Sequence, residues 1–399
     1  MIRFFLIVLL LFVSNVWAIS FDEAMTALKK HESIESILFK SHSAQNQAIL
    51  EASWGDPKLK VAFKNFPKDT LSRTQSPMTG VEYGLSQKIP LTPKYGTVKQ
   101  AFSALSQAYN YEAKDKKEML AKAFWKILIL KKEIVRQRTI LKESIAWIEK
   151  ILKVTKGLYA TGKVSQQALL DIQIRKSELE RDISNKDFEQ SQIDEKLIYL
   201  IGSSEIENST IPWDILDRSV TKAVDYRALS LQERLKFKNY NVKASKLDYV
   251  PDLTLFVGYT DRSDVDSYGD FVSASITLNL PFSDQKSSKY GMALQEKFQV
   301  EKDYENYKRA KHRDILLLTH EIKKLSKEIE ILDTKMIKFA VNSREITSKS
   351  YSTGGSTYIE LLQSELKLQK ILMQKIALES NRDIQKVALK YIKGEALYE

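Results

Sequence analysis

Cysteine is absent from this chain of 399 residues, and glycine and proline are scarce, with 13 and 8 residues. Without cysteine there is no disulfide, no thiolate metal site and no residue for lipid attachment after an export signal. Scarce glycine and proline together with abundant Lys, Glu, Leu, Ile and Gln are typical of long helices. A chain of this length must therefore gain its stability from a packed core or from assembly.

Patterns that carry chemistry are missing as well. No Ser/His/Asp set, phosphate-binding glycine loop or carboxylate pair stands in a pocket-like context, so we expect no enzyme activity and no cofactor. The four histidines and the aspartates of 261–270 lack the spacing of a metal site. The net charge of +11 comes from Lys and Arg interleaved with Asp and Glu. That pattern favours solvated helix faces over a nucleic-acid surface.

The N-terminus has the features of an export signal. Arg3 supplies a positive start, residues 4–13 are uniformly apolar, and Ala18 is a small residue suited to cleavage. We expect a signal peptide over 1–18 and a mature chain from Ile19. No later stretch reaches the roughly 18 to 20 apolar residues that a helical membrane span needs.

Two segments, 97–156 and 292–353, contain neither glycine nor proline over 60 and 62 residues. With a rise of 1.5 Å per residue, each predicts a helix of roughly 90 Å. Apolar residues recur in both at spacings of three and four, which predicts coiled-coil-like packing.

Both segments end in the same pattern. The first ends in Tyr159, Gly162 and Ser165, and the second in Tyr351, Gly354 and Thr357, 192 positions later; a Leu-Leu pair follows each. Glycine ends a helix by adopting a left-handed conformation, and Ser or Thr begins the next helix by capping it. The pattern predicts two tight helix–turn–helix reversals.

Each long segment is preceded by two short stretches in which apolar and polar residues alternate, within 57–90 and 251–281. This period of two predicts a β-hairpin in each, with one apolar and one polar face. An apolar-out, polar-in strand of about ten residues is also typical of transmembrane β-barrels.

The chain is therefore predicted to be mostly α-helical with a membrane β-barrel, built by duplication. The first repeat, 19–213, has a β-hairpin at about 57–90, a long helix at about 96–156, a tip turn at about 157–165 and a return helix. The second, 214–399, has the corresponding elements at about 251–281, 286–350 and 351–357, with its own return helix. A further helix over roughly 214–246 leads into the second hairpin.

Open sheet edges are not tolerated in hydrocarbon, so strands in a membrane must close into a barrel. One chain offers four strands, whereas small membrane barrels have about eight. Several chains must then share one barrel, with the long helices continuing as a tube. A periplasmic coiled-coil adaptor, with the strands in a soluble β-domain, is the alternative.

The residues in this order resemble the TolC-like outer-membrane efflux proteins over the mature chain. The resemblance rests on Phe21-Asp22-Glu23-Ala24, the two Tyr-x-x-Gly reversals, 249–253 entering the second hairpin and 275–282 leaving it. Residues 77–83 and 86–90 resemble the heavy-metal (cation) efflux branch.

The resemblance implies a homotrimer with a twelve-stranded outer-membrane barrel and a periplasmic α-helical tunnel. Such a protein is a passive duct in tripartite efflux or type I secretion. It works with a periplasmic adaptor and an inner-membrane pump of the resistance–nodulation–division or ABC type. The implied adaptor-docking tip comprises Tyr159, Gly162, Lys163, Ser165, Tyr351, Gly354, Gly355 and Ser356. The implied channel-constriction residues are Asp171, Glu360 and Gln363.

Overall fold

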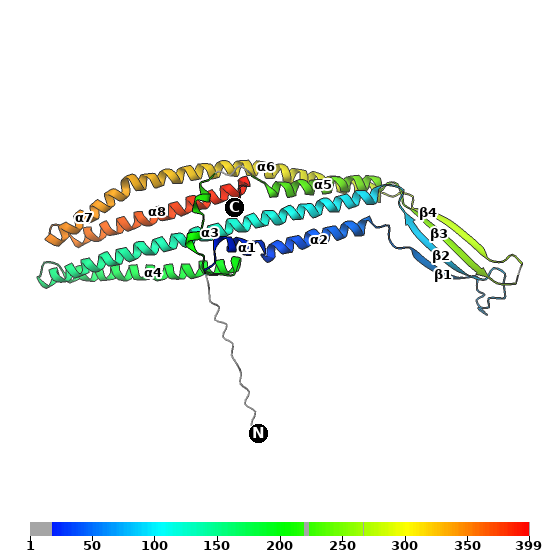
Figure 1. Cartoon of the computed structure of the whole chain (residues 1–399), viewed down its shortest axis with the longest axis horizontal. Helices are drawn as coiled ribbons and strands as arrows, with labels where there is room; N and C mark the ends of the chain where they lie inside the picture. Colours follow the sequence, from blue (N-terminus) through cyan, green and yellow to red (C-terminus); the bar gives the residue numbers. More distant parts are fainter. Residues whose placement is uncertain (1–17, 219–222, 266, 399) are drawn as a thin grey trace, which may run out of the picture. The chain divides into compact units, whose positions relative to one another are not determined.

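The computed structural model describes residues 18–218, 223–265 and 267–398, and Figure 1 shows the chain. Apart from Ala18, the predicted signal peptide lies outside the described residues. The described residues form two compact units. Unit 1 comprises 18–34, 115–225 and 310–398, and unit 2 comprises 35–114 and 226–309, with the gaps just given. Each unit combines segments from both predicted repeats.

Unit 1 is built around two helical hairpins. The later part of α3 (Lys94–Ala160) runs beside α4 (Gln166–Ile201), and α7 (Ile337–Thr353) runs beside α8 (Tyr358–Lys393) (Figure 1). A π-helical turn, η3 (Leu332–Met336), connects α7 to the end of α6 (Gln285–Ile331). One buried cluster takes residues from all four hairpin helices: Leu141, Ile148, Ile151, Ile172, Leu179, Tyr351 and Leu361. Their helical spacing explains why the two hairpins pack together.

The other end of unit 1 is closed by aromatic residues and short elements. These elements are α1 (Phe21–Lys29) and the 3₁₀ turns η1 (Asn208–Thr210) and η2 (Trp213–Leu216). The ring of Phe21 packs against Phe124 and Trp125, and the Trp125 indole N–H donates to the Leu397 carbonyl at 2.8 Å. Ser20 and Glu23 form a capping box that begins α1, which satisfies its first backbone N–H groups.

The helix predicted over roughly 214–246 begins later than expected, as α5 (Tyr226–Leu247). Before it, the Val224 N–H donates to the Gly394 carbonyl at 2.8 Å, and Ala223 forms an isolated bridge with Glu395. Residues 223 and 224 are therefore paired with a distant segment and do not belong to the helix. For α2 (Glu32–Ala52) the sequence patterns gave no prediction.

Unit 2 contains one antiparallel sheet in the order β1-β2-β3-β4. Its strands are β1 (Lys58–Lys64), β2 (Gly80–Ile89), β3 (Leu253–Arg262) and β4 (Phe271–Leu278). The two predicted hairpins are confirmed, and β2 pairs with β3 to join them. Strands β1 and β4 are the edges of the sheet within one chain.

The helices of unit 2 are joined by small polar and aromatic contacts. The Ser230 hydroxyl of α5 donates to the Ala108 carbonyl of α3 at 2.9 Å, and the rings of Phe102 and Phe237 lie 5.6 Å apart. Among the described helices, none is both long enough and apolar enough to cross a membrane.

Candidate functional site

The strand register gives the sheet two chemically distinct faces. Successive residues of a strand point to opposite faces, so paired residues share a face. Leu85 pairs with Leu59 on one side and Val257 on the other, and Val257 pairs with Ala274. The residues of this face are Leu59, Val61, Phe63, Val81, Tyr83, Leu85, Gln87, Ile89, Leu253, Leu255, Val257, Tyr259, Asp261, Val272, Ala274, Ile276 and Leu278.

This apolar face is open to the surroundings. Leu59, Phe63 and Val272 are each about three-quarters exposed, and Ile276 is 64% exposed. Its charged residue is Asp261, which lies near the end of β3 and pairs with Arg73 of the β1–β2 loop. A continuous exposed apolar surface of this kind needs a hydrocarbon or protein partner, because it is unfavourable in water.

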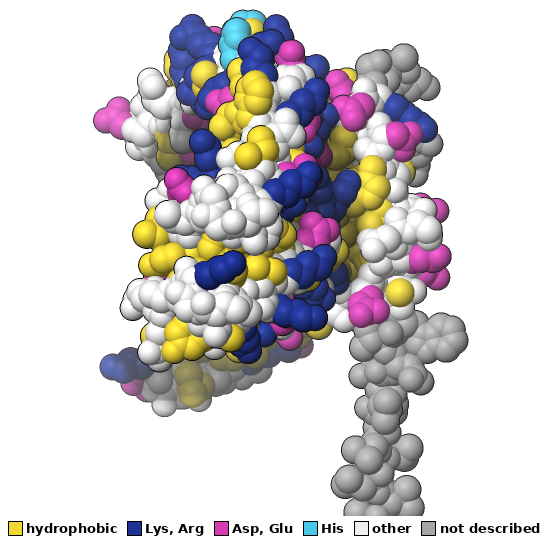
Figure 2. Space-filling view, turned by 90° about the vertical axis from the view of Figure 1, so that its left-hand side faces the viewer, with side chains coloured by type: hydrophobic (Ala, Val, Ile, Leu, Met, Phe, Trp, Pro, Cys, Tyr) yellow, Lys and Arg dark blue, Asp and Glu magenta, His cyan; other side chains and the backbone are white. Residues whose placement is uncertain are grey.

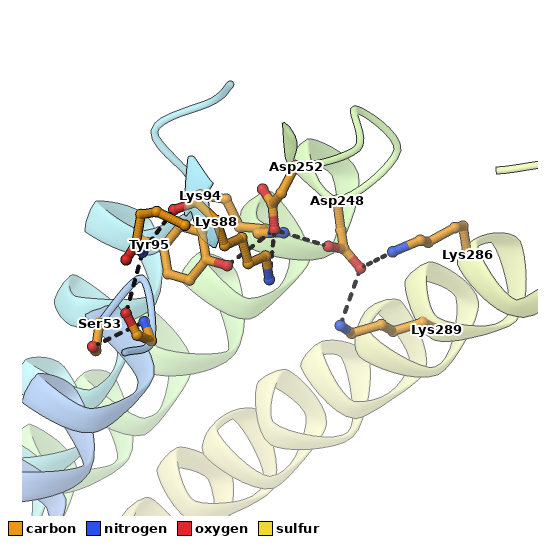
Figure 3. Close-up of polar contacts among 10 residues, drawn as sticks. Ser53, Lys88, Lys94, Tyr95, Asp248, Asp252, Lys286 and Lys289 are labelled. Atoms are coloured by element: carbon orange, nitrogen blue, oxygen red, sulfur yellow. Dashed lines mark hydrogen bonds and ion pairs between the residues drawn. The ribbon is translucent and has the colours of Figure 1, made fainter. Parts of the chain in front are cut away.

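A network of ion pairs lies where the sheet of unit 2 meets its helices (Figure 3). The Lys94 ammonium lies 2.8 Å from Asp248 and 3.0 Å from Asp252, and so joins the carboxylates that precede β3. Lys286 and Lys289 at the start of α6 bind Asp248 at 2.7 and 3.2 Å. Burial would raise the pKa of Asp248, but the lysines that donate to it outweigh burial and hold that pKa well below its ordinary value.

The first reversal lies between α3 and α4. Gly162 has a left-handed backbone with φ of 74°, and its N–H donates to the Tyr159 carbonyl at 2.9 Å. The Lys163 N–H donates to the Leu158 carbonyl at 2.9 Å, which completes the helix end. Ser165 then caps α4 by accepting from the Ala168 N–H at 3.3 Å.

The second reversal, between α7 and α8, is built in the same way but has a stronger cap. Gly354 has φ of 85°, and the Gly355 N–H donates to the Ser350 carbonyl at 2.8 Å. Thr357 begins α8 by accepting from the Glu360 N–H at 3.2 Å, while the Glu360 carboxylate accepts from the Thr357 N–H at 2.8 Å. The side chain of Glu360 therefore serves as half of a capping box.

The two tyrosines that match in sequence lie in different environments. Tyr159 is 44% exposed, whereas Tyr351 is 2% exposed and packs in the core cluster of the hairpins. The Tyr351 hydroxyl lies 3.0 Å from that of Thr155 in α3. We call residues 158–166 and 350–360 the tip. Within it, Tyr159, Gly162, Lys163, Ser165, Gly354 and Gly355 are exposed, and Ser356 is partly buried and donates to the Thr347 carbonyl.

Asp171 makes a contact between the two hairpins. It accepts from Gln167 of its own helix at 2.8 Å, and it lies close enough to the Tyr358 hydroxyl of α8 to act on the pKa of that group. The hydrogen bond to Asp171 is also the largest reason that the pKa of Tyr358 lies above its ordinary value. The third constriction candidate, Gln363, is exposed on α8. The structure thus connects Asp171 with the start of α8 and places Glu360 at its cap.

Buried charged residues behind the tip were missed from the sequence. Arg175 of α4 is nearly buried and donates to Gln369 of α8 and, at 2.8 Å, to Glu178. Arg344 of α7 donates at 3.2 Å to Glu365 of α8, which is 1% exposed. The sequence does contain one sign of this buried charge. Arg175 follows Ile172 by three residues and so interrupts a row of apolar residues at helical spacing.

The exposed surface near the first reversal is basic. Lys150, Lys153, Lys156 and Lys163 are all exposed, and no Asp or Glu occurs over 150–170. Figure 2 views the chain from the end that carries both turns, and Lys and Arg side chains are numerous on the face it shows. A partner that binds here must tolerate or complement positive charge.

Unit 1 also contains a groove away from the tip. This half-open groove of about 560 Å³ lies between α3, α4 and the segment before η2, where the Lys132 ammonium lies 3.9 Å from the centre of the Trp213 ring. None of the predicted site residues lines this groove. Within 18–218, 223–265 and 267–398, no group of three or more His, Cys, Asp or Glu side chains is placed to hold a metal ion.

Comparison with known proteins relates the chain to others by structure only. No protein-family model matches the sequence, and no curated protein sequence matches it. The outer membrane protein VceC of Vibrio cholerae is similar with a TM-score of 0.77 at 14% identity, over 94% of this chain and 96% of that one. The CmeC outer membrane channel of Campylobacter jejuni has a TM-score of 0.74 at 15% identity, over 95% and 86%.

CusC, a protein that undergoes conformational changes on folding and transmembrane channel formation, also has a similar structure. Its TM-score is 0.77 at 14% identity, over 94% of this chain and 92% of that one. These matches cover nearly all of both chains. They show that the chain has the fold of a TolC-like channel protomer, in which hairpin strands alternate with long helical hairpins.

Proposed function

We propose that this chain, which has the TolC-like protomer fold, is the outer-membrane channel subunit of an export system. It conducts solutes passively from a periplasmic adaptor and an inner-membrane pump to the exterior, and it is not an enzyme. The observation that carries this proposal is the register of the sheet. That register gathers most apolar residues of the four strands on one exposed face and all of their charged residues except Asp261 on the other. Lipid on one side and water on the other is the environment that suits such a sheet.

The strand count requires several copies, and the number three comes from the resemblance to TolC-like channels. Four strands cannot close a barrel, and their open edges are not tolerated in hydrocarbon. Edge strand β1 of one copy would pair with edge strand β4 of the next, so three copies give a barrel of twelve strands. The helices then form a periplasmic tunnel around the same axis. The similarity to outer membrane channels supports this arrangement.

The tip is the proposed docking site for the adaptor. It exposes the glycines of the two turns together with Tyr159, Lys163 and Ser165. Tyr351 is buried and packs beneath them in the core cluster of the hairpins. The basic residues on α3 favour an adaptor that presents carboxylates. The pump belongs to the resistance–nodulation–division or the ABC class. Asp171 and Gln363 stand at the constriction, and Glu360 belongs to it by shaping the start of α8.

The adaptor alternative predicts a different environment for the sheet. In a soluble adaptor, residues such as Leu59, Phe63 and Ile276 would have to be covered by another part of the chain, but all three are exposed. The solved structures that share the fold over nearly the whole chain are named as outer membrane proteins or channels. Both observations favour the channel.

Two substitutions at adjacent positions of β4 test the proposal. Ile276→Lys puts a charge on the apolar face, where lysine at the bilayer midplane costs about 2–4 kcal/mol. Ser275→Lys puts the same charge on the polar face. We expect Ile276→Lys to lose trimers from the outer-membrane fraction and Ser275→Lys to keep them. Equal loss, equal retention, or recovery of the unaltered protein from the soluble periplasm would contradict the proposal.

A further inference from the structure

The charged residues of the four strands are distributed very unevenly. The polar face carries Lys58, Lys60, Lys64, Lys88 and Arg262 but a single carboxylate, that of Glu82. The strand residues of this face therefore carry an excess of four positive charges per chain, which becomes three when the ion pair of Lys88 with Asp252, just before β3, is counted. Hydrocarbon cannot hold these groups, so in a membrane barrel the polar face must be the one that lines the lumen.

The single carboxylate is already shared by two of the lysines. Glu82 is 2% exposed, and its oxygens lie 3.0 Å from the Lys60 ammonium and 2.5 Å from that of Lys64. Both lysines keep about half or somewhat less of their side-chain surface exposed. The Lys60 ammonium also lies 5.2 Å from the centre of the Phe256 ring. The group of Lys60, Glu82 and Lys64 thus keeps one net positive charge at the surface of the sheet.

Phe256 explains why two glycines occupy this face. Its ring lies over Gly84 and Gly258, where added Cβ atoms would come within 2.2 and 2.8 Å of ring atoms. The ring lies beside the Lys60 ammonium, and the Lys60 and Lys64 side chains keep 54% and 39% of their surface exposed. The charged wall therefore stays accessible to solutes.

Closure of the barrel does not supply the missing carboxylates. If β1 of one copy pairs with β4 of another, the neighbouring polar face consists of Phe271, Ser273, Ser275 and Thr277. All four are uncharged, so three copies would keep the whole positive excess. This step rests on the proposed function.

At the far ends of the strands, Asp261 near the end of β3 and aspartates of the loop that follows also oppose this charge. Among them, Asp270 accepts from the Arg262 N–H at 2.8 Å and from the Tyr259 hydroxyl, and Asp261 pairs with Arg73. These carboxylates lie at or beyond the strand ends that are remote from the helices of unit 2. Their hydrogen bonds lower the negative potential that they project along the strands.

We propose that the barrel lumen selects anions, and that the solutes this channel conducts best are negatively charged. Fixed charge on a pore wall raises the local concentration of the opposite ion and repels ions of the same sign. The effect is largest at low salt, because the Debye length is about 30 Å at 0.01 M and about 10 Å at 0.1 M. The proposal argues against free metal cations as cargo, which the resemblance of 77–90 had suggested.

Purified trimers in planar bilayers under a KCl gradient provide the test. We expect the reversal potential to give a chloride-to-potassium permeability ratio above 1, rising as both salt concentrations are lowered. Lys58 is exposed at the start of β1, so Lys58→Glu should lower the ratio severalfold without disturbing the core. Lys68→Glu makes the same charge change in the β1–β2 loop and should leave the ratio nearly unchanged.

A second variant distinguishes an effect of charge from an effect of misfolding. The combined change Lys60→Gln, Glu82→Gln and Lys64→Gln keeps hydrogen-bonding groups, removes one net charge per chain, and should lower the ratio less than Lys58→Glu does. A ratio at or below 1 in the unaltered protein overturns anion selectivity while leaving the channel proposal intact. So does a Lys68→Glu effect equal to that of Lys58→Glu. Trimers that carry no ion current at all contradict the channel proposal itself.

Discussion

The hydroxyl groups of Thr155 and Tyr351 lie 3.0 Å apart in the buried contact between α3 and α7. Thr155 also donates to the Ile151 carbonyl of its own helix at 2.9 Å, so the Tyr351 hydroxyl is positioned as a donor to Thr155. The pair ties one helical hairpin to the other directly behind the two turns. The matching tyrosine of the first turn, Tyr159, is exposed instead.

We expect Tyr351→Phe to lower the free energy of unfolding by about 1 kcal/mol, the net value of a typical intramolecular hydrogen bond. Tyr159→Phe, at the matching position of the first turn, should have little effect because that side chain is exposed. Denaturant unfolding of the detergent-solubilised protein, followed by circular dichroism, measures both. Equal effects of the two substitutions would show that the difference in burial has no energetic consequence.

Glycine to alanine substitutions at Gly354 and Gly157 should act in opposite directions. Gly354 has φ of 85°, a conformation that costs an L-residue about 1–2 kcal/mol. Gly157 lies inside α3, and a Cβ added there meets nothing within 4 Å. Alanine should therefore stabilise the helix at Gly157 by about 0.5–1 kcal/mol. Thermal melting compares the two; destabilisation by both would contradict the reasoning about helix conformation at Gly157.

The capping box predicts separable effects for Thr357 and Glu360. Thr357→Ala removes the cap and should cost about 1 kcal/mol, seen as faster amide hydrogen exchange over 358–363. Glu360→Gln keeps an acceptor for the Thr357 N–H and should retain most of that protection. Single-channel conductance of Glu360→Gln and of the unaltered protein tests whether the charge of Glu360 also affects ions that pass through the channel. A large change in cation conductance for Glu360→Gln, with exchange unaltered, would mean that the carboxylate lines the pore as well.

The ion-pair network of Asp248 predicts a dependence of stability on pH. Its carboxyl has a pKa in the folded protein below the ordinary value of 3.8, so its stabilisation is fully present above about pH 4. The contribution declines as the pH falls below that value, because the carboxyl is then protonated in the unfolded chain before it is protonated in the folded protein. Asp248→Asn should cost about 2 kcal/mol at pH 7, as expected for a hydrogen-bonded charged group, and less at pH 3.

Asp303→Asn, in the exposed part of α6, is the matched control and should change little at either pH. Thermal melting at pH 7 and pH 3 gives both comparisons. A cost of Asp248→Asn that is the same at the two pH values would contradict the assignment of the effect to the carboxylate.

Local patterns were enough for most of the fold. Apolar/polar alternation predicted both hairpins, because successive residues of a strand point to opposite faces and here the two faces have different surroundings. The absence of glycine and proline over 97–156 predicted α3, and the Tyr-x-x-Gly patterns predicted where the chain reverses. The late start of α5 was not predictable, since pairing of Val224 with Gly394 decides it and no local pattern records that contact.

The sequence by itself determined the length of the helices, the positions of the two turns and the alternation of the strands, because each depends on residues near one another in the chain. Only the tertiary structure decided which of those residues are buried and which charged residues share a surface. It placed Tyr351 in the core and Tyr159 at the surface, although both occupy the same position in the repeat. It also aligned four strands so that Lys58, Lys60 and Lys64 share a face with one carboxylate. Burial and net charge of a surface are properties of packed segments, which is why a repeat that is nearly symmetric in sequence is asymmetric in its interactions.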